Sequence, residues 1–239
     1  MNNQPIILAK KLVKSFGPLT VLRELDFEVA PGEFVALLGP NGSGKTTLLR
    51  ILATLSRPTS GLVRVAAYQL PQAEADLRNH LGLVSHQPLL YGDLTAEENL
   101  QFFSKLYSIS EDRIREVLDI VGLVKRKDDL VRNFSRGMQQ RLAIGRAILH
   151  NPQILLLDEP YTGLDQEAGE ILDSLLLGNA REGRTVLMTS HNLVRAANLA
   201  TRVDLLSRGR ITASVPTSQL GSKDLIEFYR EGLRGGGPV

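Results

Sequence analysis

The chain of 239 residues has no cysteine and no long run of apolar residues. Without cysteine it has no disulfides, no zinc sites with cysteine ligands and no thiol nucleophile. No segment reaches the about 18 apolar residues of a membrane-spanning helix, and the first five residues lack the charged and apolar regions of a secretory signal. The net charge of +2 gives little support to nucleic-acid binding. We therefore expect a soluble cytoplasmic protein with no nucleic-acid partner.

A glycine-rich segment directly after an apolar run is the most informative feature present. The run 34–38 has the composition of a buried strand, and residues 39–46 match the pattern G-x-x-x-x-G-K-[ST]. Glycines let the backbone turn tightly so that several N–H groups point at one anion, and a helix that begins near Lys45 adds the positive end of its dipole. Lys45 is expected to reach the β- and γ-phosphates of a nucleotide, and the Thr46 hydroxyl to bind Mg²⁺. The expected ATP-binding residues are Gly39, Pro40, Asn41, Gly42, Ser43, Gly44, Lys45, Thr46 and Thr47.

Strand and helix patterns alternate along the chain. Alternating apolar residues predict strands in the first 38 residues. Helical spacing over 46–55 follows the glycine-rich segment, and the patterns of 154–157, 166–177 and 185–188 predict a strand, a helix and a strand. This βαβ order is typical of a parallel sheet. No internal repeat is present, so we expect one nucleotide-binding unit.

The middle of the chain is helical in pattern, from about residue 93 to residue 132. Thr95 and Glu98 form a capping box at its start. An apolar stripe at i, i+3, i+4 and i+7 follows, made of Ile114, Val117, Leu118 and Val121. These features predict a helical insertion between two parts of the sheet. Nearer the end, residues 203–206 and 211–215 are expected to pair as a hairpin.

Two carboxylates stand directly after the apolar strand 154–157. Open α/β sheets bind their ligands at such strand ends. Asp158 can take part in the coordination shell of Mg²⁺. Glu159 can orient or deprotonate the water that attacks a γ-phosphate. The alternative is a polar strand end before Pro160, which the glycine-rich segment upstream makes less favourable.

Four further segments resemble those of the ATP-binding cassette (ABC) ATPases, and the resemblance covers nearly the whole chain. Residues 133–141, with the sequence NFSRGMQQR, resemble the family signature L-S-G-G-Q-x-Q-R. Gln87 is similar to the residue of the glutamine loop, and residues 162–165, TGLD, resemble the D-loop. His191 follows a predicted strand and resembles the switch histidine, which can donate a hydrogen bond to the γ-phosphate.

The resemblance implies an α/β fold of the P-loop NTPase type. It has a mostly parallel core sheet, an N-terminal antiparallel β subdomain and an inserted α-helical subdomain. The implied nucleotide-binding domain spans residues 1–220, with the helical insertion at about 88–150. Residues 221–239 are expected to form a C-terminal helix and a disordered tail.

The resemblance also implies a head-to-tail homodimer and a set of roles. Ser135 and Gly137 of one subunit would close on the γ-phosphate held by Lys45 of the other. Phe16 resembles the aromatic residue that stacks on adenine, with core packing as the alternative. The sequence departs from the family at Arg136, which either contacts the partner or points to solvent, and at Met138. The implied catalytic residues are Glu159, His191 and Gln87, and the implied Mg²⁺ ligands are Thr46, Gln87 and Asp158.

As a member of this family, the chain would be the ATP-hydrolysing subunit of a transporter, held at the cytoplasmic face of the membrane by separate permease subunits. We expect residues 87–100 to dock on them through Leu89, Leu90 and Tyr91, although burial within the insertion is the alternative. Several segments look most like the haem-export ATP-binding proteins of bacterial cytochrome c maturation, and similar ones occur in drug and antibiotic efflux ATPases. A non-transport ABC ATPase and a P-loop kinase are the remaining alternatives.

Overall fold

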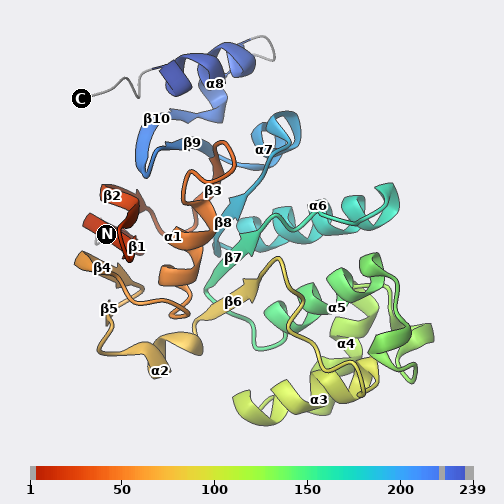
Figure 1. The fold of residues 1–239 in the computed structure, drawn as a ribbon. Helices are drawn as coiled ribbons and strands as arrows, with labels where there is room; N and C mark the ends of the chain where they lie inside the picture. Colours follow the sequence, from red (N-terminus) through yellow and green to blue (C-terminus); the bar gives the residue numbers. More distant parts are fainter. Residues whose placement is uncertain (1–3, 221–223, 235–239) are drawn as a thin grey trace.

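Short apolar runs build the larger of two sheets in the computed structural model, which describes residues 4–220 and 224–234 (Figure 1). Its strands are β3 (Phe34–Leu38), β6 (Leu81–Val84), β7 (Ile154–Asp158), β8 (Thr185–Thr189), β9 (Arg202–Ser207) and β10 (Arg210–Pro216). Their order is β10-β9-β3-β8-β7-β6, and all neighbours are parallel except β10 and β9. Every residue of β3, β7 and β8 is buried, as expected for strands covered on both faces. The predicted parallel sheet is confirmed.

A smaller antiparallel sheet is formed mainly by the first third of the chain. Its strands are β1 (Ile7–Phe16), β2 (Leu19–Val29), β4 (Ser60–Val65) and β5 (Tyr68–Leu70), in the order β2-β1-β4-β5. The alternation in β2 buries Leu25, Phe27 and Val29 on one face. Helix α1 (Lys45–Leu52) contacts both β2 and β7, and its apolar side chains belong to one core with those of both sheets. Because α1 packs against both sheets, the position of Lys45, its first residue, is fixed relative to the strands.

Two helix boundaries differ from the predicted ones. Helix α1 ends at Leu52 rather than at residue 55, because Thr54 takes the left-handed conformation with a φ of 62°. Helix α6 (Gln166–Arg181) runs past residue 177 and ends where Gly183 takes a φ of 80°. Glycine adopts such a conformation without steric cost, so it ends a helix readily.

The helical insertion forms a layer beyond the β6 edge of the larger sheet (Figure 1). Its elements are α3 (Ala96–Tyr107), α4 (Glu111–Ile120), η1 (Val124–Arg126), η2 (Val131–Asn133) and α5 (Arg136–Ile148). Thr95 and Glu98 form the predicted capping box, with backbone to side-chain distances of 3.1 and 2.8 Å. The predicted apolar stripe is buried, and α4 packs against α3 and α5.

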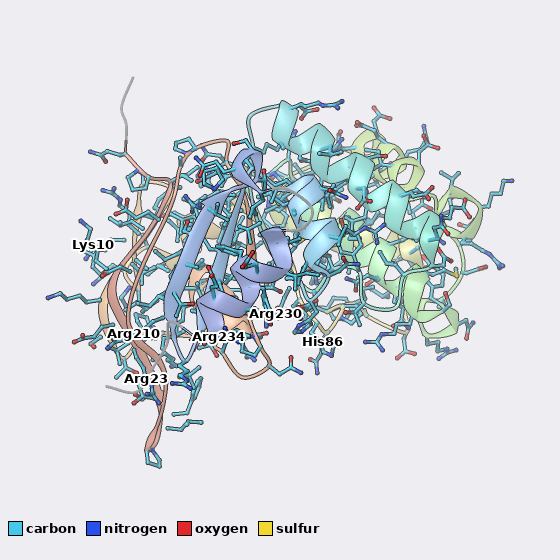
Figure 2. The ribbon with its side chains drawn as sticks, turned by 90° about the horizontal axis from the view of Figure 1, so that it is seen from above. Lys10, Arg23, His86, Arg210, Arg230 and Arg234 are labelled. Atoms are coloured by element: carbon cyan, nitrogen blue, oxygen red, sulfur yellow. The ribbon has the colours of Figure 1, made fainter. Side chains whose placement is uncertain are left out.

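Of the remaining elements, the first follows β5 in the chain and the other three lie near β9 and β10. They are α2 (Glu74–Arg78), α7 (Leu193–Leu199), η3 (Thr217–Gln219) and α8 (Asp224–Arg234). Strands β9 and β10 form the predicted hairpin, and α8 packs against both of them (Figure 2). The expected disorder of the C-terminal tail concerns residues 235–239, which lie outside the described residues. Among the described helices, none has the length and apolar character needed to cross a membrane.

Candidate functional site

The glycine-rich segment joins the end of β3 to the start of α1 and depends on glycine at two positions. Gly39 has a φ of 150°, and a Cβ there would lie 2.1 Å from the carbonyl oxygen of Leu206. Gly44 has a φ of 111°, and its Cβ would lie 2.7 Å from Leu22. The backbone of β9 excludes a side chain at Gly39, and the positive φ together with the contact to Leu22 disfavours one at Gly44.

Lys45 is buried and folds back over this loop. Its Nζ donates to the carbonyl oxygens of Gly39 at 2.7 Å and Pro40 at 3.2 Å. Burial lowers the pKa of the ammonium, whereas the nearby carboxylates of Glu159 and Asp158 act in the opposite direction. Two neutral carbonyls are weak partners for a buried cation, so a phosphate group would be a better one.

Asp158 lies at the end of β7 and gathers two hydroxyl groups. Thr189 donates to its Oδ1 at 2.8 Å, and Thr46 donates to the same atom at 3.2 Å. A carboxylate beside the Thr46 hydroxyl at the start of α1 offers the hard oxygen ligands that Mg²⁺ prefers, so these two residues would hold the ion. The structure therefore brings together Asp158 and Thr46, two of the three predicted Mg²⁺ ligands.

Glu159 and His191 are in direct contact. The Nε2 atom of His191 lies 3.1 Å from Oε1 of Glu159, and the backbone N–H of Glu159 donates to Thr189 at 2.9 Å. Glu159 has a φ of 51°, which is uncommon for a residue with a side chain. Burial raises the pKa of the Glu159 carboxyl, and His191 and Lys45 oppose that shift. A carboxylate held in this way is well suited to accept a proton.

These groups share one cavity of about 330 Å³. It is lined by Leu19, Val21, Asn41, Gly42, Ser43, Gly44, Lys45, Thr46, Thr47, Asp158, Glu159 and His191. Leu19 and Val21 were not predicted, although their spacing of two residues in β2 places them on one face of that strand. Six predicted residues are not among the lining residues: Phe16, Gly39, Pro40, Gln87, Ser135 and Gly137. The side chain of Phe16 is 54% exposed beside Lys14, so core packing is wrong, and Gln87 is exposed in the loop after β6.

The signature segment lies apart from this cavity within one chain. Ser135 caps α5 by accepting a hydrogen bond from the backbone N–H of Met138 at 3.2 Å. Gly137 packs so closely on the D-loop that a Cβ would lie 3.2 Å from the carbonyl oxygen of Gly163. Arg136 is exposed in the single chain, which is compatible with both alternatives, and its stem runs along the same glycine.

Glu159 also borders a second cavity, of about 350 Å³, on the side of the signature helix. The other lining residues are His86, Pro88, Arg136, Gln139, Gln140 and Thr162. Gln140 is buried and donates to the carbonyl oxygen of Pro160 at 2.9 Å, which fixes the chain directly after Glu159 to α5. Gln140 and Thr189 are supporting residues that sequence reasoning missed, because their partners lie far away along the chain.

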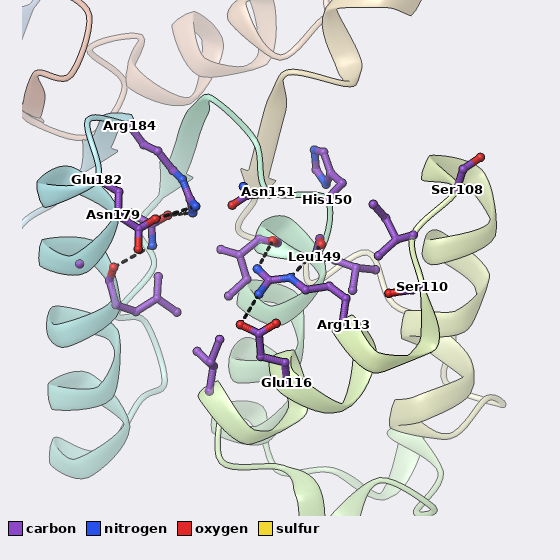
Figure 3. Close-up of a pocket in the computed structure, with 15 residues that line it drawn as sticks. Ser108, Ser110, Arg113, Glu116, Leu149, His150, Asn151, Asn179, Glu182 and Arg184 are labelled. Carbon is purple, nitrogen blue, oxygen red and sulfur yellow. Dashed lines mark hydrogen bonds and ion pairs between the residues drawn. The ribbon is translucent and has the colours of Figure 1, made fainter.

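A larger cavity of about 670 Å³ lies between α4 and α6, away from the glycine-rich loop (Figure 3). Arg113 donates there to the carbonyl oxygens of Leu149 and Ile148 and pairs with Glu116 at 2.7 Å. None of the predicted site residues lines this cavity. Although this cavity is larger than the one beside Lys45, it lacks the predicted phosphate-binding and metal-binding groups, so we do not assign a nucleotide to it.

Comparisons with known proteins agree on one family. Residues 22–162 match the family model described as ABC transporter. The linearmycin resistance ATP-binding protein LnrL of Bacillus subtilis is 33% identical over 95% of this chain and 76% of its own length. The Nod factor export ATP-binding protein I of Cupriavidus metallidurans is 34% identical, over 95% and 78%. A dimeric structure of the ATP-binding cassette MJ0796 with ADP and Pi superposes with a TM-score of 0.81 at 29% identity, covering 88% of this chain and 98% of that one.

Proposed function

Since the chain belongs to the ABC transporter family, we propose that it is the ATP-hydrolysing subunit of an exporter, held at the cytoplasmic face of the membrane by separate permease subunits. The observation that carries this proposal is the cavity shared by the glycine-rich loop, Asp158, Glu159 and His191. A phosphate-binding loop, a metal-binding carboxylate and a base at one strand edge are the parts that phosphoryl transfer to water requires.

The chemistry follows from the contacts within the cavity. Lys45 would exchange its two carbonyl acceptors for phosphate oxygens, beside the backbone N–H groups of the loop. Thr46 and Asp158 would hold Mg²⁺, which when bound neutralises charge on the phosphates. Glu159 would orient a water and take its proton. His191, in contact with Glu159, would keep that carboxylate in place and donate toward the γ-phosphate.

The second catalytic half is proposed to come from another copy of the chain. Ser135 and Gly137 are not among the residues that line the Lys45 cavity of their own subunit. A hydroxyl and a backbone N–H at the start of α5 suit an anion, and α5 would bring both to the γ-phosphate of a partner in a head-to-tail dimer. The related cassette MJ0796, whose structure with ADP and Pi is dimeric, supports this arrangement.

The surface that we propose for the permease subunits lies at residues 87–100. Leu89 and Tyr91 are exposed, so the alternative of full burial is wrong for these two side chains, whereas Leu90 packs partly against the core. Tyr91 forms an edge contact with Phe102, which is exposed as well. Leu89 also borders an apolar groove of about 250 Å³. An exposed apolar surface of this kind is typical of a protein interface.

For the cargo we propose an antibiotic or a similar exported compound. Relatives that span most of this chain are named for linearmycin resistance and Nod factor export. Haem export, to which short motifs point, has no counterpart in these two relatives and stays a prediction. The two cargoes separate in cells that carry an inactive chain. We expect raised sensitivity to antibiotics with unchanged cytochrome c content, and the reverse result would favour haem export.

Replacing the base tests the proposed reaction. Glu159→Gln keeps the shape of the side chain but removes its ability to take a proton, so we expect ATP affinity to be retained and turnover to fall at least about a hundredfold. Glu167→Gln, an exposed residue of α6, is the matched control and should hydrolyse ATP as the unaltered chain does. Phosphate release without transfer to an acceptor would exclude a kinase. Unaltered turnover by Glu159→Gln would reject the role of Glu159.

A further inference from the structure

Three side chains meet near the candidate site: Tyr161 from the loop that carries Glu159, Asp173 from α6 and Arg195 from α7. The hydroxyl of Tyr161 donates to Oδ1 of Asp173 at 2.6 Å. Nε and Nη2 of Arg195 both lie 3.2 Å from the other oxygen of Asp173, Oδ2. The guanidinium also lies 4.4 Å from the centre of the Tyr161 ring. Each oxygen of the carboxylate therefore has its own charged or polar partner, which makes this a closed network.

Arg195 can reach Asp173 because the position of α6 that it crosses is a glycine. The side chain passes directly over Gly169 of α6, where an added Cβ would lie 3.0 Å from Nη2. Tyr161, Asp173 and Arg195 are each partly buried, so water competes little with their hydrogen bonds. Burial raises the pKa of Tyr161, and the hydrogen bond to Asp173 raises it further. The phenol therefore keeps its proton and remains a donor across the physiological pH range.

The network joins the two loops that carry Glu159 and His191. Tyr161 stands two residues after Glu159, and Arg195 stands four residues after His191. Helix α7 begins within that second interval, where the side chain of Asn192 accepts from the backbone N–H of Arg195 at 2.9 Å. Both loops are thus attached to a single carboxylate on α6. Along the chain, the attachment points lie two residues after Glu159 and four residues after His191, the pair that is in contact at 3.1 Å.

We propose that Tyr161, Asp173 and Arg195 are positioning residues for ATP hydrolysis. They fix the position of the loop that carries Glu159 relative to the loop that carries His191. The base and the imidazole then meet in the geometry needed to orient water. The inference rests on the proposed function, since it assumes that Glu159 and His191 act on the γ-phosphate. It adds residues outside the phosphate cavity, because none of the three lines it.

The test removes one hydroxyl. Tyr161→Phe keeps the ring under Arg195 and loses only the hydrogen bond to Asp173. Because the phosphate-binding loop is untouched, we expect ATP affinity to stay within about twofold while kcat falls about tenfold. Asp173→Asn should reproduce the fall. Ser174→Ala is the matched control, since Ser174 is exposed on the same helix and, within the described part of the chain, its hydroxyl donates only to the backbone carbonyl of Glu170.

A double-variant cycle separates positioning from a general structural role. His191→Gln removes the contact whose geometry the network sets. Adding Tyr161→Phe to this variant should therefore change the residual kcat by less than about twofold. An additive tenfold fall in both backgrounds would overturn the proposal, as would an unchanged kcat in Tyr161→Phe alone.

The same measurements distinguish this inference from the proposed function. If the unaltered chain does not hydrolyse ATP, or if Glu159→Gln hydrolyses it normally, the proposed function fails and the positioning role fails with it. If Glu159→Gln stalls while Tyr161→Phe and Asp173→Asn match the unaltered chain, only the positioning role is wrong.

Discussion

His150 makes the stability of the protein sensitive to mild acid. The imidazole follows α5 and stacks on the ring of Tyr107, with centroids 4.0 Å apart and planes inclined by 8°. Its Nε2 lies 3.0 Å from the carbonyl oxygen of Leu81. Because a carbonyl only accepts, Nε2 carries the hydrogen, and the buried Nδ1 has no hydrogen-bond partner within the described part of the chain. A second proton on this ring would have no acceptor.

Burial lowers the pKa of His150 from 6.5 to about 4. The neighbouring cation Arg146 and the ring of His80 also lower it, and the hydrogen bond to the carbonyl of Leu81 acts in the opposite direction. As the pH falls below 6.5, the unfolded chain takes up a proton that the folded chain refuses until about pH 4. The free energy of unfolding therefore decreases with falling pH between these two values, and the contribution of His150 is complete above the upper one.

The size of the effect follows from the difference in pKa. About 2.5 units at about 1.36 kcal/mol per unit correspond to a total of roughly 3 kcal/mol, which is an upper limit because the ring is partly exposed. Most of this falls between pH 8 and pH 5, where linkage gives about 2 kcal/mol.

Reversible urea unfolding at both pH values measures this contribution. His150→Gln retains an N–H group for the Leu81 carbonyl but does not titrate, so between pH 8 and pH 5 the unaltered chain should lose about 2 kcal/mol more than the variant. His86→Gln, which removes an exposed imidazole, is the control and should follow the unaltered chain (Figure 2). Equal pH dependence in the unaltered chain and His150→Gln would refute the reasoning.

Three further predictions concern the proposed site and its surfaces. Lys45→Ala should lose ATP binding or hydrolysis, because it removes the buried cation of the glycine-rich loop; normal turnover in a phosphate-release assay would contradict that role. Ser135→Arg should still bind ATP but block closure of the dimer by bulk and charge, and mixing it with Lys45→Ala should restore some turnover in mixed dimers. No recovery, with mixed dimers shown to form, would argue against action across the interface. Replacing Leu90 and Tyr91 with aspartate should abolish co-purification with the membrane subunits while circular dichroism stays unchanged; retained assembly would rule out this docking surface.

Features encoded by neighbouring residues were predicted correctly from the sequence. The glycine-rich loop between β3 and α1 is one, since positive φ values favour glycine at Gly39 and Gly44. The capping box of Thr95 and Glu98 is another, because both hydrogen bonds join residues three apart. Asp158 is a third, because it ends β7 directly after four apolar residues. The capping box is complete within four residues of chain, whereas the atoms that a Cβ would meet at Gly39 and Gly44 belong to Leu206 and Leu22, which are remote in sequence.

Helix ends and shorter elements were less predictable. The early end of α1 depends on Thr54 adopting a left-handed conformation, which no residue pattern announces for threonine. Strand β5 and helix α2 are too short to show a period in the sequence. Their existence depends on pairing with β4 and on packing against β6.

The sequence by itself singled out most of the groups in the candidate site, whereas the tertiary structure decided which of them meet and added Leu19, Val21, Gln140 and Thr189. Glu159 and His191 follow neighbouring strands of the parallel sheet, and Asp158 accepts hydrogen bonds from Thr189 of β8 and Thr46 of α1. The network around Asp173 joins the loop before α6 to helix α7. Phe16 and Gln87, named by resemblance, do not line the cavity formed by one chain. A local pattern fixes the backbone at its own position, but the distance between remote side chains depends on how strands and helices pack, and that depends on the whole core.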